Sequence, residues 1–143
     1  MDKISLSRIT AFADSRRLEA LAGLAAEGEE VRILKEPEKT MVLLRVREPV
    51  RGEDFYLGEM LAVHCTVELG GVRGAAVIMG DDLAGVRAAA VIDALHSGGF
   101  PGFALIEGEL LRLGEEREEG RARQAALVRG TQVIFQALED REL

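Results

Sequence analysis

Apolar positions in the first part of the chain follow the period of an α-helix. Between residues 4 and 27 they recur at steps near three and four. Asp14 and Ser15 are both good helix N-cap residues, and either one could begin a second helix after a break. The pattern therefore predicts two short N-terminal helices.

From Val31 the period changes to two, which is typical of strands. Two extended segments, 31–36 and 40–47, lie on either side of the turn-rich residues 37–39, so the pattern predicts a hairpin there. In the second segment the alternation places side chains on two faces. One face holds Val42, Leu44 and Val46, and the other holds Met41, Leu43, Arg45 and Arg47.

A polar loop from Pro49 to Asp54 precedes a second, longer predicted hairpin. The dipeptide Gly70-Gly71 is a strong signal for its turn. Alternation in the first strand of this hairpin gives one face suited to a core. That face holds Leu61, Val63, Cys65, Val67 and Leu69, and the opposite face holds Met60, Ala62, His64, Thr66 and Glu68.

The rest of the chain has helical character. An Ala-rich helix is predicted over 82–97 and ends at the glycine cluster 98–102. Residues 105–138 read as one long helix or as two helices broken near Gly114 or Gly120. The predicted fold class is thus α+β: an antiparallel sheet of about four strands with N-terminal helices, a helix after the sheet and a long C-terminal helical region. A length of 143 residues fits one domain, 1–143.

Composition excludes several classes of function. The chain has 25 acidic and 18 basic side chains, a net charge of −7, and it has no Trp. Such a chain repels phosphate backbones and has few rings for base stacking, so no nucleic-acid partner is expected. The single Cys65 fits a reducing cytoplasm, and neither a signal peptide nor an 18-residue apolar run points to a membrane.

Asp81 and Asp82 raise the question of whether they are catalytic or structural. They follow an apolar strand and Gly80 and precede the Ala-rich helix, so one of them is expected to cap that helix. A metal site is the alternative, but no neighbouring His or Glu pattern completes one. Asp93 lies among apolar helix neighbours and is expected to meet an Arg, a backbone donor or a partner chain.

Three arginines give the best indication of a ligand. Arg45, Arg47 and Arg73 could gather on one sheet face and bind a phosphate or phosphonate oxygen, unless Glu59 or Glu68 neutralises them. The two histidines, His64 and His96, have no spacing typical of a metal site. His64 and Cys65 point to opposite faces and cannot pair. No catalytic or metal-binding residues are therefore assigned.

Apolar residues outside the expected core predict contact with another chain. If the helices cover the Val63 face, the opposite face with Met41, Leu43, Met60 and Ala62 is left uncovered. The end of the last helix is similarly apolar. The partner interface is predicted at these residues and at Val133, Ile134 and Phe135, and the isolated chain is expected to form a homo-oligomer.

Several segments resemble the PhnG family, the small subunit of the bacterial carbon–phosphorus lyase core complex. They are Phe55-x-Leu57-Gly58-Glu59-x-Leu61, Met79-Gly80-Asp81-Asp82, Ala89-x-x-Ile92-Asp93-Ala94-Leu95 and Thr131-x-Val133-x-Phe135. The order of helices and sheet and the chain length also agree, so the resemblance covers nearly the whole chain.

The resemblance implies a subunit without its own active site, assembled with PhnI-like, PhnH-like and PhnJ-like subunits and helped by an ATPase subunit. Such an assembly makes alpha-D-ribose 1-methylphosphonate 5-triphosphate from ATP and alkylphosphonate and releases adenine. The later radical step uses an iron–sulfur cluster and S-adenosylmethionine on the PhnJ-like partner; one cysteine cannot hold such a cluster here, so no cofactor is expected in this chain. A stand-alone small-anion binder using the three arginines is the rival interpretation.

Overall fold

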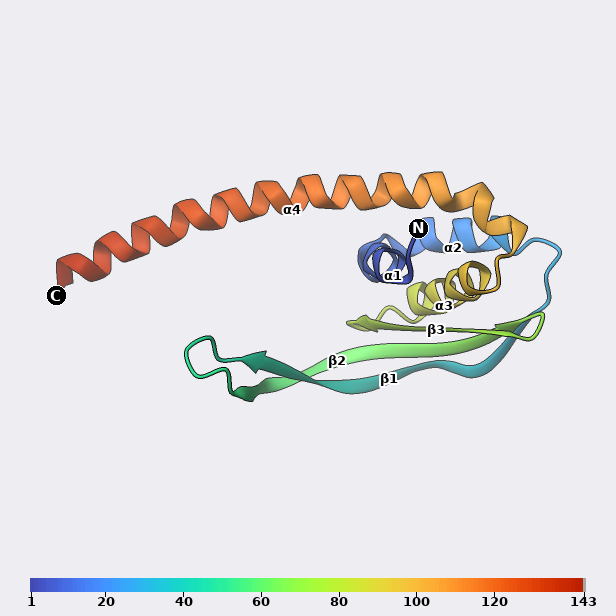
Figure 1. Cartoon of the computed structure of the whole chain (residues 1–143), viewed down its shortest axis with the longest axis horizontal. Coiled ribbons are helices and arrows are strands. Elements are labelled where there is room, and N and C mark those ends of the chain that lie inside the picture. The colour runs from blue at the N-terminus through green and yellow to red at the C-terminus, as the bar shows by residue number, and fades with distance from the viewer. Residues whose placement is uncertain (143) are drawn as a thin grey trace.

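The computed structural model describes residues 1–142, with side chains described through residue 127. It confirms the α+β class and shows a three-stranded antiparallel sheet of order β1-β2-β3, rather than about four strands, within the described residues. Helices lie on one face of this sheet (Figure 1). The elements are α1 (Lys3–Phe12), α2 (Ser15–Ala25), β1 (Val31–Arg47), β2 (Asp54–Leu69), β3 (Val72–Met79), α3 (Leu83–Ser97) and α4 (Pro101–Glu142).

Carboxylates begin the two N-terminal helices. The Asp2 side chain accepts a hydrogen bond from Ser5 N at 2.6 Å, and the Asp14 side chain accepts one from Arg17 N at 3.4 Å. Each bond satisfies one of the four backbone N–H groups that a helix leaves open at its start. The predicted break between the helices is confirmed, and Asp14 rather than Ser15 is the cap of α2.

The predicted hairpin at residues 37–39 is wrong, because β1 is one continuous strand of 17 residues. Its pairing with β2 is irregular between Ile33 and Lys35 and again between Lys35 and Glu38. These irregularities add residues to β1, and Pro37 lies within the second one. Since β1 is an outer strand of the sheet, a proline at a bulge is tolerated there without breaking the strand.

The turn at Gly70-Gly71 is confirmed, and both residues have positive φ, 52° and 83°. Beside it, Val63, Cys65, Val67 and Leu69 are at most 1% exposed and form the sheet side of the core. Leu61, predicted to join them, is 40% exposed. The reason is positional: β3 ends at Met79, opposite Ala62, so Leu61 lies just outside the three-stranded part.

Helix α3 packs directly on β3 and forms the centre of the core. A Cβ at Gly74 of β3 would lie 2.2 Å from the Ala90 oxygen, so only glycine permits this close approach. Ile92 and Leu95 of α3 are fully buried. The sheet and α3 are therefore held together by apolar burial and by a short distance between backbones.

Helix α4 is a single helix of 42 residues, with no break at Gly114 or Gly120. Its first turns bury Phe103, Ile106 and Leu110 against the other helices, and the helix then continues past them (Figure 1). No single helix within residues 1–127 is long and apolar enough to span a membrane. Helix α3 and the first part of α4 are long and apolar enough only when taken together, and they are bent by 120° relative to each other.

Candidate functional site

The two longer strands extend beyond the three-stranded part of the sheet. The last bond from the β3 side runs from Gly80 N to Leu61 O at 2.9 Å, and past this point β1 pairs with β2 alone. Figure 1 shows this extension projecting from the body in the same direction as the end of α4. We call residues 40–61 the ribbon; it comprises 40–47 of β1, 54–61 of β2 and the loop 48–53.

The ribbon carries a concentration of exposed apolar side chains. An isolated two-stranded hairpin is marginally stable in water, and a contiguous apolar patch usually marks an interaction surface. The ribbon is therefore the main candidate for a binding surface. Its exposed large apolar residues, each 37% exposed or more, are Met41, Leu43, Val46, Val50, Phe55, Tyr56, Leu57, Met60 and Leu61.

Strand register divides these residues between two faces. Met41 pairs with Leu61, and Val42 pairs with Met60. Because paired residues share a face, Met41 and Leu43 lie on the helix side of the sheet, and Met60 lies on the far side. The sequence pattern predicts them on one face, because it does not show which residue of β2 stands opposite Met41.

Two parts of the predicted interface lie outside the exposed surface of the ribbon. Ala62 lies on the far side with Met60, but it is fully buried between larger neighbours and offers no exposed surface. Val133, Ile134 and Phe135 lie outside the residues whose side chains are described. Contact of any of these residues with another chain stays a prediction.

The loop at the tip of the ribbon is held by its own hydrogen bonds. The Glu48 carboxylate accepts from Val50 N at 2.7 Å and from Arg51 N at 2.5 Å. Gly52, at φ 69°, donates its N–H to Glu48 O, and its carbonyl accepts from Arg47 Nε at 3.3 Å. The tip is thus a well-connected turn; the sequence indicated only a polar loop, although Pro49 and Gly52 signal a turn.

The three arginines do not gather into one site. Arg45 lies 3.8 Å from Asp54 and over the Tyr56 ring at 5.7 Å, and Arg47 bonds to the tip loop. Arg73, by contrast, is paired with Glu68, 12 positions beyond Tyr56 on β2, which is roughly 40 Å along a strand. The three-arginine anion site that the rival interpretation needs is therefore absent from the fold.

Two of the three aspartates make structural contacts. Asp82 is the N-cap of α3, and its Oδ1 accepts from Gly85 N at 2.9 Å, while Asp81 is exposed beside it. The buried Asp93 accepts from Ala75 N at 3.0 Å through Oδ2, and Lys3 Nζ lies 4.0 Å from its Oδ1. Asp93 therefore covers part of the outer edge of β3.

The histidines and the cysteine lie apart. His64 Nε2 is 3.9 Å from a Glu38 oxygen, and His96 Nε2 donates to Met1 O at 2.7 Å. Burial raises the pKa of the Cys65 thiol, which makes it a poor nucleophile. Within the described residues no group of three or more His, Cys, Asp or Glu side chains is placed to hold a metal ion.

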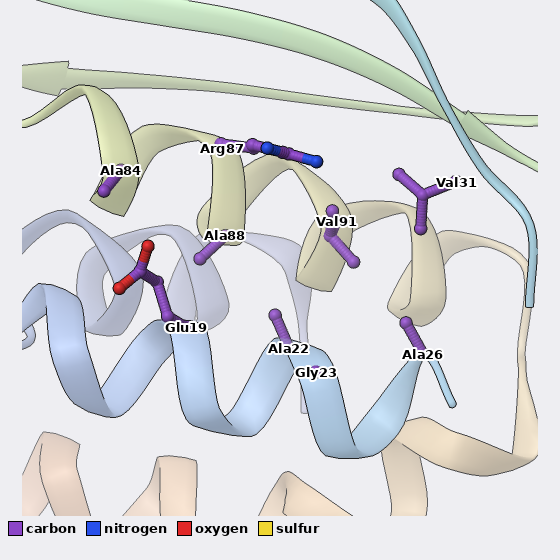
Figure 2. Close-up of a pocket in the computed structure, with 9 residues that line it drawn as sticks. All are labelled: Glu19, Ala22, Gly23, Ala26, Val31, Ala84, Arg87, Ala88 and Val91. Atoms are coloured by element: carbon purple, nitrogen blue, oxygen red, sulfur yellow. The ribbon is translucent and has the colours of Figure 1, made fainter. Parts of the chain in front are cut away.

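A shallow groove of about 260 Å³ runs between α2 and α3. Figure 2 shows Glu19 reaching into it from α2 and Arg87 from α3, with Arg87 extending toward Val31. The remaining walls are small or apolar, with Ala22, Gly23, Ala26, Ala84, Ala88 and Val91. One acid and one guanidinium on such walls do not provide a nucleophile with its base, so the groove has no catalytic set.

Comparison with protein families gives a match over nearly the whole chain. Residues 4–139 match the family described as phosphonate metabolism protein PhnG. A search of curated proteins found no match. The matched range includes the whole ribbon and nearly all of the elements described above.

Proposed function

Because the chain belongs to the PhnG family of phosphonate metabolism proteins, we propose that it is a non-catalytic subunit of a carbon–phosphorus lyase complex in the cytoplasm. In this role it contributes to the synthesis of alpha-D-ribose 1-methylphosphonate 5-triphosphate from ATP and alkylphosphonate, with release of adenine. Its partners are PhnI-like, PhnH-like and PhnJ-like subunits and an ATPase subunit. The iron–sulfur cluster and S-adenosylmethionine act on the PhnJ-like partner.

The ribbon is the observation that carries this proposal. It has only two strands, and exposed apolar side chains lie on both of its faces, with Met41 and Leu43 on the helix side and Met60 on the far side. Water solvates such a hairpin poorly, whereas a partner that encloses it buries both faces at once. We expect the same surface to drive self-association when the partner is missing.

The arrangement of polar groups supports a role without chemistry of its own. Asp82 and Asp93 bond to backbone N–H groups, and Cys65 is buried away from His64 on the opposite face. The groove between α2 and α3 brings no nucleophile, general base and anion-binding group together. Catalysis in the proposed assembly is therefore assigned to the partners.

Adenine release tests the division of labour. The purified chain, incubated with ATP and methylphosphonate, should release no more adenine than a mock preparation, and release should begin when the partner subunits are added. Chromatography of the adenine gives the measurement. Release by the isolated chain would overturn the proposal.

Copurification tests the ribbon. Leu43→Glu combined with Met60→Glu places one charge on each face, outside the buried core. We expect a folded chain with an unchanged thermal midpoint that no longer copurifies with its partners. Leu24→Glu, at a 51% exposed position on α2, is the matched control and should assemble normally. Normal assembly of the double variant would place the contact elsewhere.

A further inference from the structure

Within the described residues, the outer edge of β1 in the ribbon has free backbone groups. The Leu61 carbonyl accepts from Gly80 N, so it points toward the β3 side of β2. In an antiparallel ladder both polar groups of a residue point to the same side, so the Leu61–Met41 pair is not hydrogen-bonded. The N–H and C=O of Met41 therefore point away from β2, and by alternation those of Lys39 and Leu43 do too.

Other edges of the sheet are less regular or are partly covered: past Leu61 the edge of β2 is open where β3 has ended, but an irregularity between Gly58 and Tyr56 interrupts it. Asp93 bonds to Ala75 N at the outer edge of β3. The first part of β1 has two register irregularities and contains Pro37. From Glu38 to Leu44, in contrast, β1 pairs with β2 without a break. A regular and unprotected edge is the geometry to which another strand can be added.

The side chains along this edge specify the added strand. On the helix-side face β1 presents Lys39, Met41, Leu43, Arg45 and Arg47 in succession, a basic–apolar–apolar–basic–basic pattern. The irregularity after Leu44 adds a residue to β2, so the alternation of β1 continues through it. Lys39 has no ion pair within the described residues. A complementary strand has apolar residues opposite Met41 and Leu43 and acids opposite the basic residues.

A second copy of the chain fits this edge poorly. A two-fold axis can pass through an outward-pointing residue, which then faces its own copy, or through the residue between two outward-pointing ones. Centred on Leu43, it sets Lys39 against Arg47; centred on Arg45, it sets that arginine against its own copy. Centred on Met41, it brings Pro37, which has no N–H, to the pairing line. Centred on Val42, it sets Lys39 against Arg45, and centred on Thr40, it again brings Pro37 to the pairing line. Centred on Leu44, it sets Leu43 against Arg45 and Met41 against Arg47. Each register therefore repels, loses a bond or sets apolar side chains against basic ones.

We infer that the edge of β1 from Lys39 to Arg47 binds an extended segment of a partner protein as an additional strand, in which acidic side chains flank an apolar pair. The backbone bonds to Met41 and Leu43 hold the segment, and the acidic residues select it over other strands. The identity of the partner rests on the proposed function; the edge and its chemistry do not.

A designed peptide tests the edge directly. The nonapeptide ETETVTVTE, paired antiparallel, places Glu opposite Lys39, Arg45 and Arg47 and Val opposite Met41 and Leu43. The control KTKTVTVTK differs only in charge. In NMR titrations of the full chain we expect the acidic peptide to bind at least about tenfold more tightly and to slow amide exchange at Met41 and Leu43. Equal binding of the two peptides would overturn the inference.

Two substitutions at one position separate backbone from side-chain binding. Leu43→Pro removes the outward N–H without touching a bond to β2, and Leu43→Thr removes the same apolar side chain but keeps the N–H. Strand addition requires that Leu43→Pro binds the acidic peptide at least about tenfold more weakly than Leu43→Thr, because Pro removes a backbone bond and its ring obstructs the edge. Equal affinities would contradict it.

A charge reversal gives an independent result even if the proline variant does not fold. Lys39→Glu combined with Arg45→Glu should reverse the preference, so that KTKTVTVTK binds more tightly than ETETVTVTE; an unchanged preference contradicts the inference. Assembly with the phosphonate-metabolism subunits distinguishes the two proposals. If Leu43→Pro assembles as well as Leu43→Thr, strand addition is wrong and the proposed function stands. If the wild-type chain binds the acidic peptide but not those subunits, the proposed function is wrong.

Discussion

Strand β2 contains two halves that look alike in sequence and differ in environment. In residues 62–69 the helix-side positions Val63, Cys65, Val67 and Leu69 are at most 1% exposed, whereas every residue from 54 to 61 is exposed. Both halves are rich in apolar residues. The difference is that β3 and α3 cover one half and end before the other. An apolar strand residue thus stabilises the fold or remains available to a partner, according to where its neighbours stop.

The two halves should therefore respond differently to substitution. The body unfolds as a unit because its side chains pack against β3 and the helices, whereas the ribbon can open locally without exposing the core. Substitutions matched in residue type or contact, one in each half, measure this difference.

The largest effect on the free energy of unfolding is expected for substitution of Leu69, which we compare with Leu61. Both leucines lie on the helix-side face of β2, but Leu69 is 0% exposed and Leu61 is 40% exposed. Leu69→Ala should lower the free energy of unfolding by about 2–5 kcal/mol, since it leaves a cavity. Leu61→Ala should lower it by about 1 kcal/mol or less. Urea unfolding followed by circular dichroism measures both; equal losses would show that the ribbon belongs to the cooperative core.

A smaller loss of stability is expected when two carboxylates that accept backbone hydrogen bonds are removed. Asp82 caps α3 in the body, and Glu48 holds the tip of the ribbon. Asp82→Ala should lower the free energy of unfolding by about 0.5–2 kcal/mol. Glu48→Ala should leave the thermal midpoint unchanged and speed amide exchange only in residues 48–53.

The exposed Asp81 is the control for the cap. Asp81→Ala should leave the thermal midpoint as in the wild type, because its carboxylate makes no capping bond within the described residues. Loss of turnover in the assembled complex without loss of stability, for either aspartate, would contradict a purely structural role.

The smallest effect on stability, but a clear effect on reactivity, concerns the Cys65 thiol. Burial raises its pKa above the ordinary value of 9.0, so the folded chain favours the neutral thiol. The resulting stabilisation is present below pH 9.0 and is lost as the pH rises through the raised pKa. At pH 8 Cys65 should react slowly with a thiol reagent until the chain is unfolded. A cysteine introduced in the ribbon by Leu61→Cys should react rapidly; equal rates would mean that the body opens as readily as the ribbon.

Local patterns were sufficient to predict much of the fold. The helical periods, the Asp14 and Asp82 positions before helices and the Gly70-Gly71 turn each depend on a few neighbouring residues. Pro37 led to the wrong prediction of a turn. A proline can also lie at a bulge of an outer strand, and the sequence does not show which strand is outermost. The Asp93 contact with Ala75 likewise joins residues 18 positions apart and leaves no local signal.

The sequence by itself determined most of the secondary structure, the apolar character of both halves of β2 and the resemblance to a family. Only the tertiary structure decided that Met41 stands opposite Leu61, that Arg73 lies far from Arg45, and that the ribbon extends beyond its cover. The physical reason is that periodicity and capping act within a few residues. Register and burial, in contrast, depend on where distant segments begin and end, and a shift of one residue in register exchanges the two faces of a strand.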